Sequence, residues 1–199
     1  MKPLEDFAID VRLASGLIAH IRPLRPDDRE RIAQAIRGLT PESIYTRLFS
    51  HRKGLTEAAL DRVMQSDPVR EVVLVATLPA RTGEAIIGAA RYVAPPAPAA
   101  LDRADVAFVV EEDYQGQGLA GRLLGRLAEV ARDRGIFRFE ADVLIENSAM
   151  LRVFSRAGLV AQRTNEGDSV HLWLDLSQTA PPQAVGATKS ARGATDGSG

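Results

Sequence analysis

Residues 109–122 read VVEEDYQGQGLAGR, and this stretch is the most informative in the chain. Gly116, Gly118 and Gly121 spell the G-x-G-x-x-G pattern of dinucleotide-binding loops, and two of them also have the glycine spacing of a P-loop. An apolar run precedes the glycines and an amphipathic run follows them, which predicts a strand, a tight loop and a helix. Such a loop directs backbone N–H groups toward an anion at the positive end of the helix dipole. The stretch therefore predicts a phosphate site.

Two nucleotide-binding interpretations of this loop fit the residues poorly. A P-loop continues with a Lys for the phosphates and a Ser or Thr for Mg²⁺, whereas Arg122 and Leu123 follow Gly121. In a dinucleotide-binding fold the first glycine ends the strand, but here the five polar residues 111–115 intervene. That fold also needs several further β-α-β units, and only one short helix is expected after residue 145.

The remaining sequence predicts one α/β (α+β) domain. Strands are expected at 17–24, 70–78, 85–93, 104–110, 137–145, 159–164 and 169–176, and helices at 27–39, 41–49, from 56 onward, 119–135 and 147–157. We therefore expect a sheet of six to seven strands flanked by helices over residues 17–176. Residues 1–16 are predicted to be an N-terminal extension. Residues 177–199 contain no Leu, Ile or aromatic residue and are predicted to be a disordered tail.

Composition narrows the functional classes. The 199 residues include no cysteine, which excludes disulfides, thiolate zinc sites and a cysteine nucleophile. The three histidines are scattered, so no metal site is expected. The net charge of -1 does not indicate a nucleic-acid partner. Neither a signal peptide nor a membrane-spanning apolar segment is evident, and we expect a cytoplasmic protein without membrane contact.

A third interpretation accounts for the whole loop. Gln115, Gly118 and Ala120 form the pattern Gln-x-x-Gly-x-Ala, which resembles the pyrophosphate loop of the GNAT acetyltransferase superfamily. ADVAFVV at 104–110 resembles the fourth strand of that family, and ENSAMLRVFSRAGL at 146–159 resembles its fifth strand and following helix. The resemblance covers about residues 17–176 and implies a GNAT fold with a mixed, mostly antiparallel sheet. It also implies transfer of an acetyl group from acetyl-CoA to a primary amine, without a metal.

The resemblance assigns the cofactor contacts to three segments. They are Phe108, Val109, Val110, Gln115, Gly116, Gln117, Gly118, Leu119, Ala120, Asn147 and Phe154. The loop would hold the diphosphate of acetyl-CoA, and the strand before it would pair with the pantetheine arm. Asn147 would bond that arm, while Phe154 either packs near the thioester or is a core residue. The backbone N–H groups of Val109 and Val110 would stabilise the tetrahedral intermediate.

The acceptor amine must lose a proton before it attacks, because a lysine side chain is protonated at neutral pH. Many family members carry a Glu for this purpose in the pattern Ala-Glu-x-x-Phe. The matching run is 104–108, so Asp105, one methylene shorter, is the expected base and acts through a water. The alternatives are that Asp105 merely solvates a strand end, and that the base is Glu111, Glu112 or Glu140.

The resemblance also bears on the leaving group and the acceptor. Phe154 occupies the position of the family's usual Tyr acid, so the thiolate is expected to leave unassisted or with help from water. HIRPLRPDD at 20–28 and TPESIYTRLFSHRKGLTEAAL at 40–60 resemble the acetyltransferase domain of bacterial protein lysine acetyltransferases, of which this chain is expected to be a free-standing version. The acidic run 105–113 favours a cationic acceptor such as a protein lysine. A small-molecule amine acceptor, a non-catalytic acyl-CoA-binding module and a homodimer all remain compatible with the sequence.

Overall fold

The computed structural model describes residues 1–37 and 67–177. The helices predicted at 41–49 and from residue 56, and the tail predicted beyond residue 177, lie outside the described residues. None of the helices within the described ranges combines the length and the apolar character needed to cross a bilayer.

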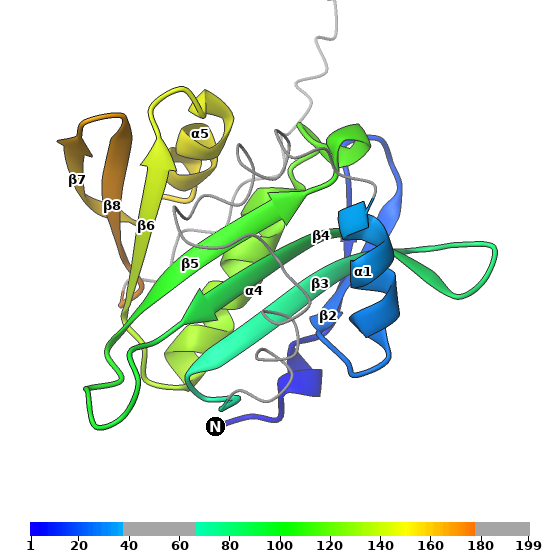
Figure 1. Cartoon of the computed structure of the whole chain (residues 1–199), viewed down its shortest axis with the longest axis horizontal. Helices are drawn as coiled ribbons and strands as arrows, with labels where there is room; N and C mark the ends of the chain where they lie inside the picture. The colour runs from blue at the N-terminus through cyan, green and yellow to red at the C-terminus, as the bar shows by residue number, and fades with distance from the viewer. Residues whose placement is uncertain (38–66, 178–199) are drawn as a thin grey trace, which may run out of the picture.

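These residues form a single mixed sheet with helices on both faces (Figure 1). The strands are β1 (Ile9–Arg12), β2 (Ile18–Pro23), β3 (Glu71–Pro79), β4 (Glu84–Val93), β5 (Arg103–Val110), β6 (Arg138–Leu144), β7 (Val160–Glu166) and β8 (Ser169–Asp175). The helices are α1 (Asp28–Arg37), α4 (Leu119–Asp133) and α5 (Ser148–Arg156), with 3₁₀ turns η1 (Leu4–Phe7) and η2 (Glu112–Tyr114).

The sheet order is β1-β2-β3-β4-β5-β6-β8-β7, and every neighbouring pair is antiparallel except β5 and β6. The expected mixed, mostly antiparallel architecture is confirmed. The sheet has eight strands rather than six or seven, because Ile9–Arg12 pairs with β2. This strand is short and lies at the edge, and Val11 is its one buried side chain, so its sequence lacks a clear alternating pattern.

Helix α4 covers one face of the sheet and connects the two parallel strands. Gly118 is its N-cap residue. The helix buries the apolar side chains Leu119, Leu123, Leu124, Leu127, Ala128, Val130 and Ala131. Its first turn lies so close to β4 that a Cβ added to Gly88 would be 3.1 Å from the Val109 carbonyl oxygen and 3.2 Å from Leu119 Cδ2. The close approach of helix to strand at Gly88 thus places the N-terminus of α4 directly beside the end of β5.

Helix α1 lies on the opposite face, where a buried ion-pair network anchors its first turn. The guanidinium of Arg22 donates to both carboxylate oxygens of Asp28, at 2.6 and 2.8 Å, and also to Glu84 at 2.5 Å. Arg22 and Asp28 are fully buried. Burial alone would raise the pKa of Asp28, but hydrogen bonds from Arg22, the Arg25 backbone N–H and Arg31 outweigh it and hold the pKa below its usual range. The network joins β2, β4 and α1.

Replacing Asp28 with Asn tests this network, because the substitution removes a buried charge and keeps the side-chain volume. We expect the free energy of unfolding at neutral pH to fall by about 3–5 kcal/mol. Because the folded-state pKa is lowered, the contribution of Asp28 is present above the unfolded-state pKa and is lost as the pH falls through the folded-state value. The difference in the free energy of unfolding between the wild type and the variant should therefore become smaller as the pH falls. Asp27→Asn is the matched control, since that side chain is 65% exposed, and urea unfolding at several pH values measures both. Equal losses for the two variants would contradict this assignment.

Candidate active site

The two parallel strands at the centre of the sheet separate part-way along their length. Strand β5 pairs with β6 only over the first three residues of each, ending with Asp105 opposite Glu140. Strand β4, on the other side, continues to pair with β5 as far as Val110. Within the described residues, 106–110 therefore have no partner strand on the β6 side. Figure 1 shows β5 and β6 diverging from this point toward α5 and the start of α4.

The backbone groups that face this gap follow from the strand register. The N–H of Glu111 donates to the Ile87 carbonyl oxygen on β4 at 3.0 Å. Because backbone groups alternate along a strand, the N–H of Val109 also faces β4, whereas those of Phe108 and Val110 face the gap. The carbonyl oxygen of Val110 accepts a hydrogen bond from Gln115 Nε2 at 3.1 Å, which agrees with this assignment. Among the described residues, the N–H groups of Phe108 and Val110 and the carbonyl oxygen of Phe108 thus have no strand partner and can pair with an extended ligand.

The glycine-rich loop closes the wide end of the gap. Gly116 and Gly118 have φ values of +72° and +83°, and Gly118 is the N-cap residue of α4. A Cβ at either position would meet open space, so backbone conformation is what favours glycine there. Among the described residues, the amide N–H groups of residues 116–121 have no hydrogen-bond acceptor. A loop with unpaired N–H groups at the N-terminus of a 15-residue helix fits an anion such as a diphosphate.

The other predicted cofactor contacts are divided between the loop and the core. Gln117 donates through Nε2 to the Asp113 carbonyl oxygen at 3.0 Å, and its Oε1 is buried without a hydrogen-bond partner among the described residues. The Leu119 side chain is buried under the sheet, so only its backbone faces the loop. Ala120, in the first turn of α4, is partly exposed.

Gly118 and Gly121 provide a matched test of the loop. Gly121 lies inside α4 at negative φ, and a Cβ there would also meet open space. We expect Gly118→Ala to lower the free energy of unfolding by about 1–2 kcal/mol and to weaken anion binding, since Ala disfavours positive φ. Gly121→Ala should stabilise the protein by up to about 1 kcal/mol, because Ala favours a helix interior. Thermal unfolding with and without CoA distinguishes the two, and equal effects would contradict the assigned roles.

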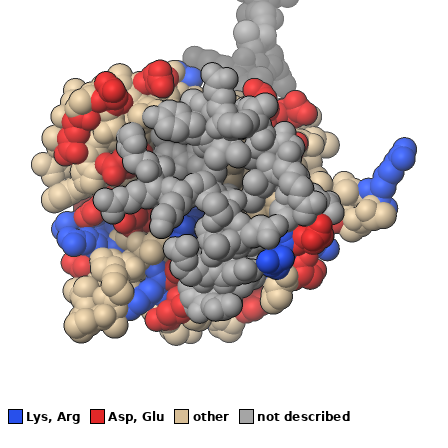
Figure 2. Space-filling view, viewed as in Figure 1, with Lys and Arg blue, Asp and Glu red and all other residues tan. Residues whose placement is uncertain are grey.

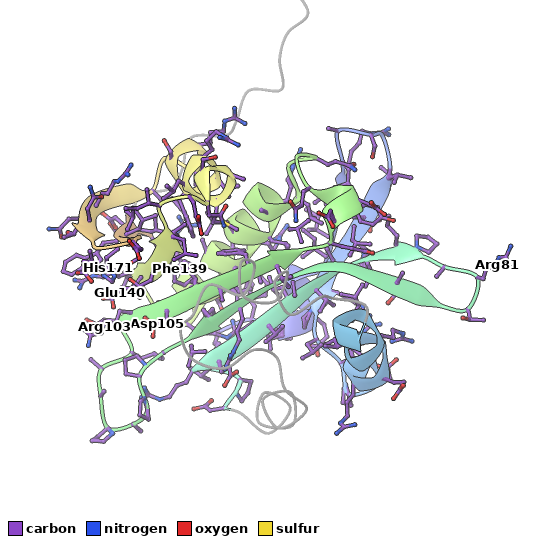
Figure 3. All side chains as sticks on the ribbon, turned by 45° about the horizontal axis from the view of Figure 1, so that its top comes forward. Arg81, Arg103, Asp105, Phe139, Glu140 and His171 are labelled. Atoms are coloured by element: carbon purple, nitrogen blue, oxygen red, sulfur yellow. The ribbon has the colours of Figure 1, made fainter. Side chains whose placement is uncertain are left out.

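Asp105 and Glu140 lie at the narrow end of the gap, where β5 and β6 come together (Figure 3). Their carboxylates share the face opposite α4. Glu111 and Glu112 are at the other end of β5, beside the glycine loop. Of the four acids considered from the sequence, the structure brings two together and separates the other two from them.

The environment of Asp105 favours its protonated form. The side chain is solvent-exposed, but partial desolvation, followed by the negative charges of Glu140 and Asp142, raises its pKa above the usual range. Arg103 and His171 act in the opposite direction and more weakly. A proton acceptor must be ionised before it can accept a proton. A carboxylate with a raised pKa is a stronger base in this ionised form.

Asn147 and Phe154 have clear structural roles in α5. Asn147 is the N-cap residue, and its Oδ1 accepts a hydrogen bond from the Met150 N–H at 3.0 Å, which leaves its amide N–H₂ group as a donor. Phe154 is 1% exposed and meets the ring of Phe108 edge-on, with centroids 5.8 Å apart. It is thus a core residue that holds α5 against β5 beside the gap.

The sequence did not reveal a cluster of polar and aromatic side chains on β6 and β8 next to Asp105. Trp173 and His171 alternate with buried residues along β8, and Arg138 lies on β6. The alternation in SVHLWLD signals that these side chains share a face, but only the register β5-β6-β8 shows that they adjoin Asp105. Figure 2 shows acidic and basic side chains gathered on the part of this face formed by β6, β7 and β8. In residues 1–37 and 67–177, no three His, Asp or Glu side chains are grouped as metal ligands.

Comparison with known proteins agrees with this geometry. A family model described as an acetyltransferase (GNAT) domain matches residues 19–160. The chain belongs to the GNAT acetyltransferase family. The GNAT domain of the Streptomyces lividans PAT protein superposes with a TM-score of 0.74 at 37% identity, covering 88% of this chain and 99% of that one. The expected GNAT fold is confirmed, and the family is one of acyltransferases.

Two curated relatives are acetyltransferases. Acetyltransferase Pat of Mycolicibacterium smegmatis is 35% identical over 159 residues, which cover 80% of this chain and 46% of the relative. An acetyltransferase of Pseudomonas aeruginosa is 32% identical over 151 residues, covering 76% of this chain and 80% of the relative. The chain thus spans about half the length of the mycobacterial Pat protein.

Proposed function

We propose that this GNAT domain transfers an acetyl group from acetyl-CoA to the side-chain amine of a protein lysine. The observation that carries the proposal is the gap between β5 and β6, with an anion-binding loop at one end and a carboxylate of raised pKa at the other. The six residues from Asp105 to Val110 span roughly 17 Å of strand, which is comparable to an extended pantetheine arm. A diphosphate on the loop would thus bring a thioester to the region of Asp105.

The residues that line the gap suggest how the cosubstrate is held. The N–H groups of 116–121 would bind the diphosphate, and the free edge of β5 at Phe108 and Val110 would pair with the amide groups of the arm. The side-chain amide of Asn147 can donate to the same arm from the other side of the gap. Phe154 and Phe108 form an apolar wall beside it.

The transfer step uses Asp105 as the base. Asp105 would accept the ammonium proton through a water, and the neutral amine would then attack the thioester carbonyl carbon and form the new C–N bond. The developing oxyanion needs a hydrogen-bond donor, and the register favours the N–H of Val110 over that of Val109, which faces β4. Collapse breaks the C–S bond and releases the thiolate. The attacking nitrogen loses its second proton to water as the amide forms, and the thiolate takes a proton from water because Phe154 has none to give.

The protein acceptor is inferred from the resemblance of residues 20–28 and 40–60 to bacterial protein lysine acetyltransferases, and the relatives support the acyl transfer. The chain is 35% identical to acetyltransferase Pat and superposes on a cAMP-binding acyltransferase from Mycobacterium smegmatis with a TM-score of 0.59, 32% identity and coverage of 90% of this chain and 49% of that one. A second candidate, a small amine, is supported by 35% identity over 86 residues to an L-amino acid N-acyltransferase of Escherichia coli, although that match covers only 39% of this chain.

Release of free CoA from acetyl-CoA distinguishes the candidates. The purified chain would be tested against lysine-containing proteins and peptides, free amino acids and polyamines, with calorimetry of acetyl-CoA in parallel. We expect CoA release with lysine in a protein or peptide and much slower release with free amines. Faster release with free amines would favour the small-amine candidate. Acetyl-CoA binding without turnover of any amine would indicate a non-catalytic binding module.

Asp105→Asn tests the base. We expect kcat/KM at neutral pH to fall by about 10²- to 10⁴-fold. In the wild type, the rate should fall as the pH falls through the raised pKa of Asp105, because only the ionised carboxylate accepts a proton. The rate of the variant should not show this fall at acidic pH, and the variant should bind acetyl-CoA as the wild type does. Glu112→Gln is the control, since that acid lies at the far end of β5, and an unchanged pH profile in the Asp105 variant would exclude Asp105 as the base.

A further inference from the structure

Glu140 has an unusual position for a partly buried carboxylate. It lies directly across from Asp105 on β5 and from Trp173 on β8, so the three residues form one row across the sheet. Its side chain is 18% exposed, and it accepts no hydrogen bond from any residue in the described ranges. Its ion-pair partner there, Arg138, is 3.8 Å away, too far for a hydrogen bond. Glu140 thus keeps its acceptor capacity at the narrow end of the gap.

Arg138 is also part of a chain of contacts on β6 and β8. The Arg138 guanidinium lies over the indole ring of Trp173, with Cζ 4.5 Å from the ring centroid. The indole Nε1–H donates to His171 Nε2 at 2.6 Å, and His171 Nδ1 lies 2.7 Å from Asp142 Oδ1. Because the indole is only a donor, Nε2 must be the acceptor, and the Nδ1–H of the ring then donates to Asp142. The indole is therefore fixed in its plane, and the guanidinium stacks on it.

We propose that Glu140 is a second carboxylate of the acceptor site, which binds the ammonium group of the incoming lysine beside Asp105. In the same arrangement Trp173 is a positioning residue that, by stacking with Arg138, prevents this cation from pairing closely with Glu140. The inference rests on the proposed amine acetyltransferase function and extends it. The ammonium group would donate to Glu140 and, through a water, to Asp105, which takes the proton.

Division of these tasks between two carboxylates suits the short side chain of Asp105. One methylene less than a Glu increases the distance between base and amine, and a second carboxylate that holds the amine compensates for this. Glu140 also places a negative charge next to Asp105. On the strands around Glu140, the charged or titratable side chains of this face belong to β5, β6 and β8, with others further away on β3, β4 and β7. They are Arg103, Arg138, Asp142, His171 and Asp175, and then Glu71, Arg91 and Glu166.

Glu140→Gln provides the direct test, because Gln keeps the shape and removes the charge. With a lysine peptide as acceptor, we expect the KM for the peptide to rise about 10- to 100-fold, as for loss of a hydrogen bond to a charged group. The kcat should stay within about threefold of the wild type. The fall in kcat/KM at acidic pH should move to lower pH, because the charge of Glu140 helps to raise the pKa of Asp105. Asp105→Asn should instead lower kcat. Glu140→Asp should recover part of the peptide KM.

Trp173 is tested with Trp173→Leu and Trp173→Phe. Loss of the stacking surface in the Leu variant should free Arg138 to pair with Glu140 and raise the peptide KM several-fold. The Phe variant keeps a ring for Arg138 and should have a smaller effect. The KM for acetyl-CoA should not change in either variant, and thermal unfolding checks that each is folded.

The outcomes separate this inference from the function on which it rests. If the wild type releases no CoA with any amine, the proposed function fails. If the wild type is active and Glu140→Gln has an unchanged peptide KM and an unchanged fall in kcat/KM at acidic pH, the ammonium site is refuted. If Glu140→Gln loses kcat at an unchanged peptide KM, Glu140 is the base and the division of tasks proposed here is wrong.

Discussion

The point where β5 and β6 stop pairing is the constraint on which the site depends. Two parallel strands joined by a helix need a crossover, and here the crossover α4 begins directly after the loop that follows β5. The pairing lasts only as far as Asp105 and Glu140, so β5 extends beyond it with one edge that no described strand covers. The free edge follows from this separation, and the two carboxylates and the glycine loop lie at its opposite ends.

The two faces of the sheet have different roles, because one is buried and the other is not. Side chains on the α4 face pack into the core, and Phe108 contacts Phe154 there. Side chains on the other face are polar near the separation, where Asp105, Glu140 and Trp173 form one row. Because side chains alternate along a strand, one short run can contribute both to the core and to the site. The sequence 104–108 does so, with Ala104 and Phe108 buried and Asp105 exposed.

The features that could be predicted from the sequence are local ones. The strand, loop and helix around Gly118 follow from alternation, glycine and an amphipathic pattern within one continuous stretch. Neighbours across the sheet could not be derived in this way, because register is set by packing between distant segments. Glu140 was therefore one of three alternative bases in the sequence, and its position opposite Asp105 became clear only from the β5-β6 pairing. Val109 was expected to share the oxyanion with Val110, yet strand alternation turns its N–H toward β4.

The central claim is that the separated strands bind acetyl-CoA with its thioester beside the two carboxylates. A crystal structure of the chain with acetyl-CoA tests this most directly. The account requires the diphosphate on the N–H groups of residues 116–121, the pantetheine arm along the edge of β5 at Phe108 and Val110, and the thioester near Asp105 and Glu140. A cofactor bound elsewhere, or bound in the gap with its thioester directed away from both carboxylates, would contradict it.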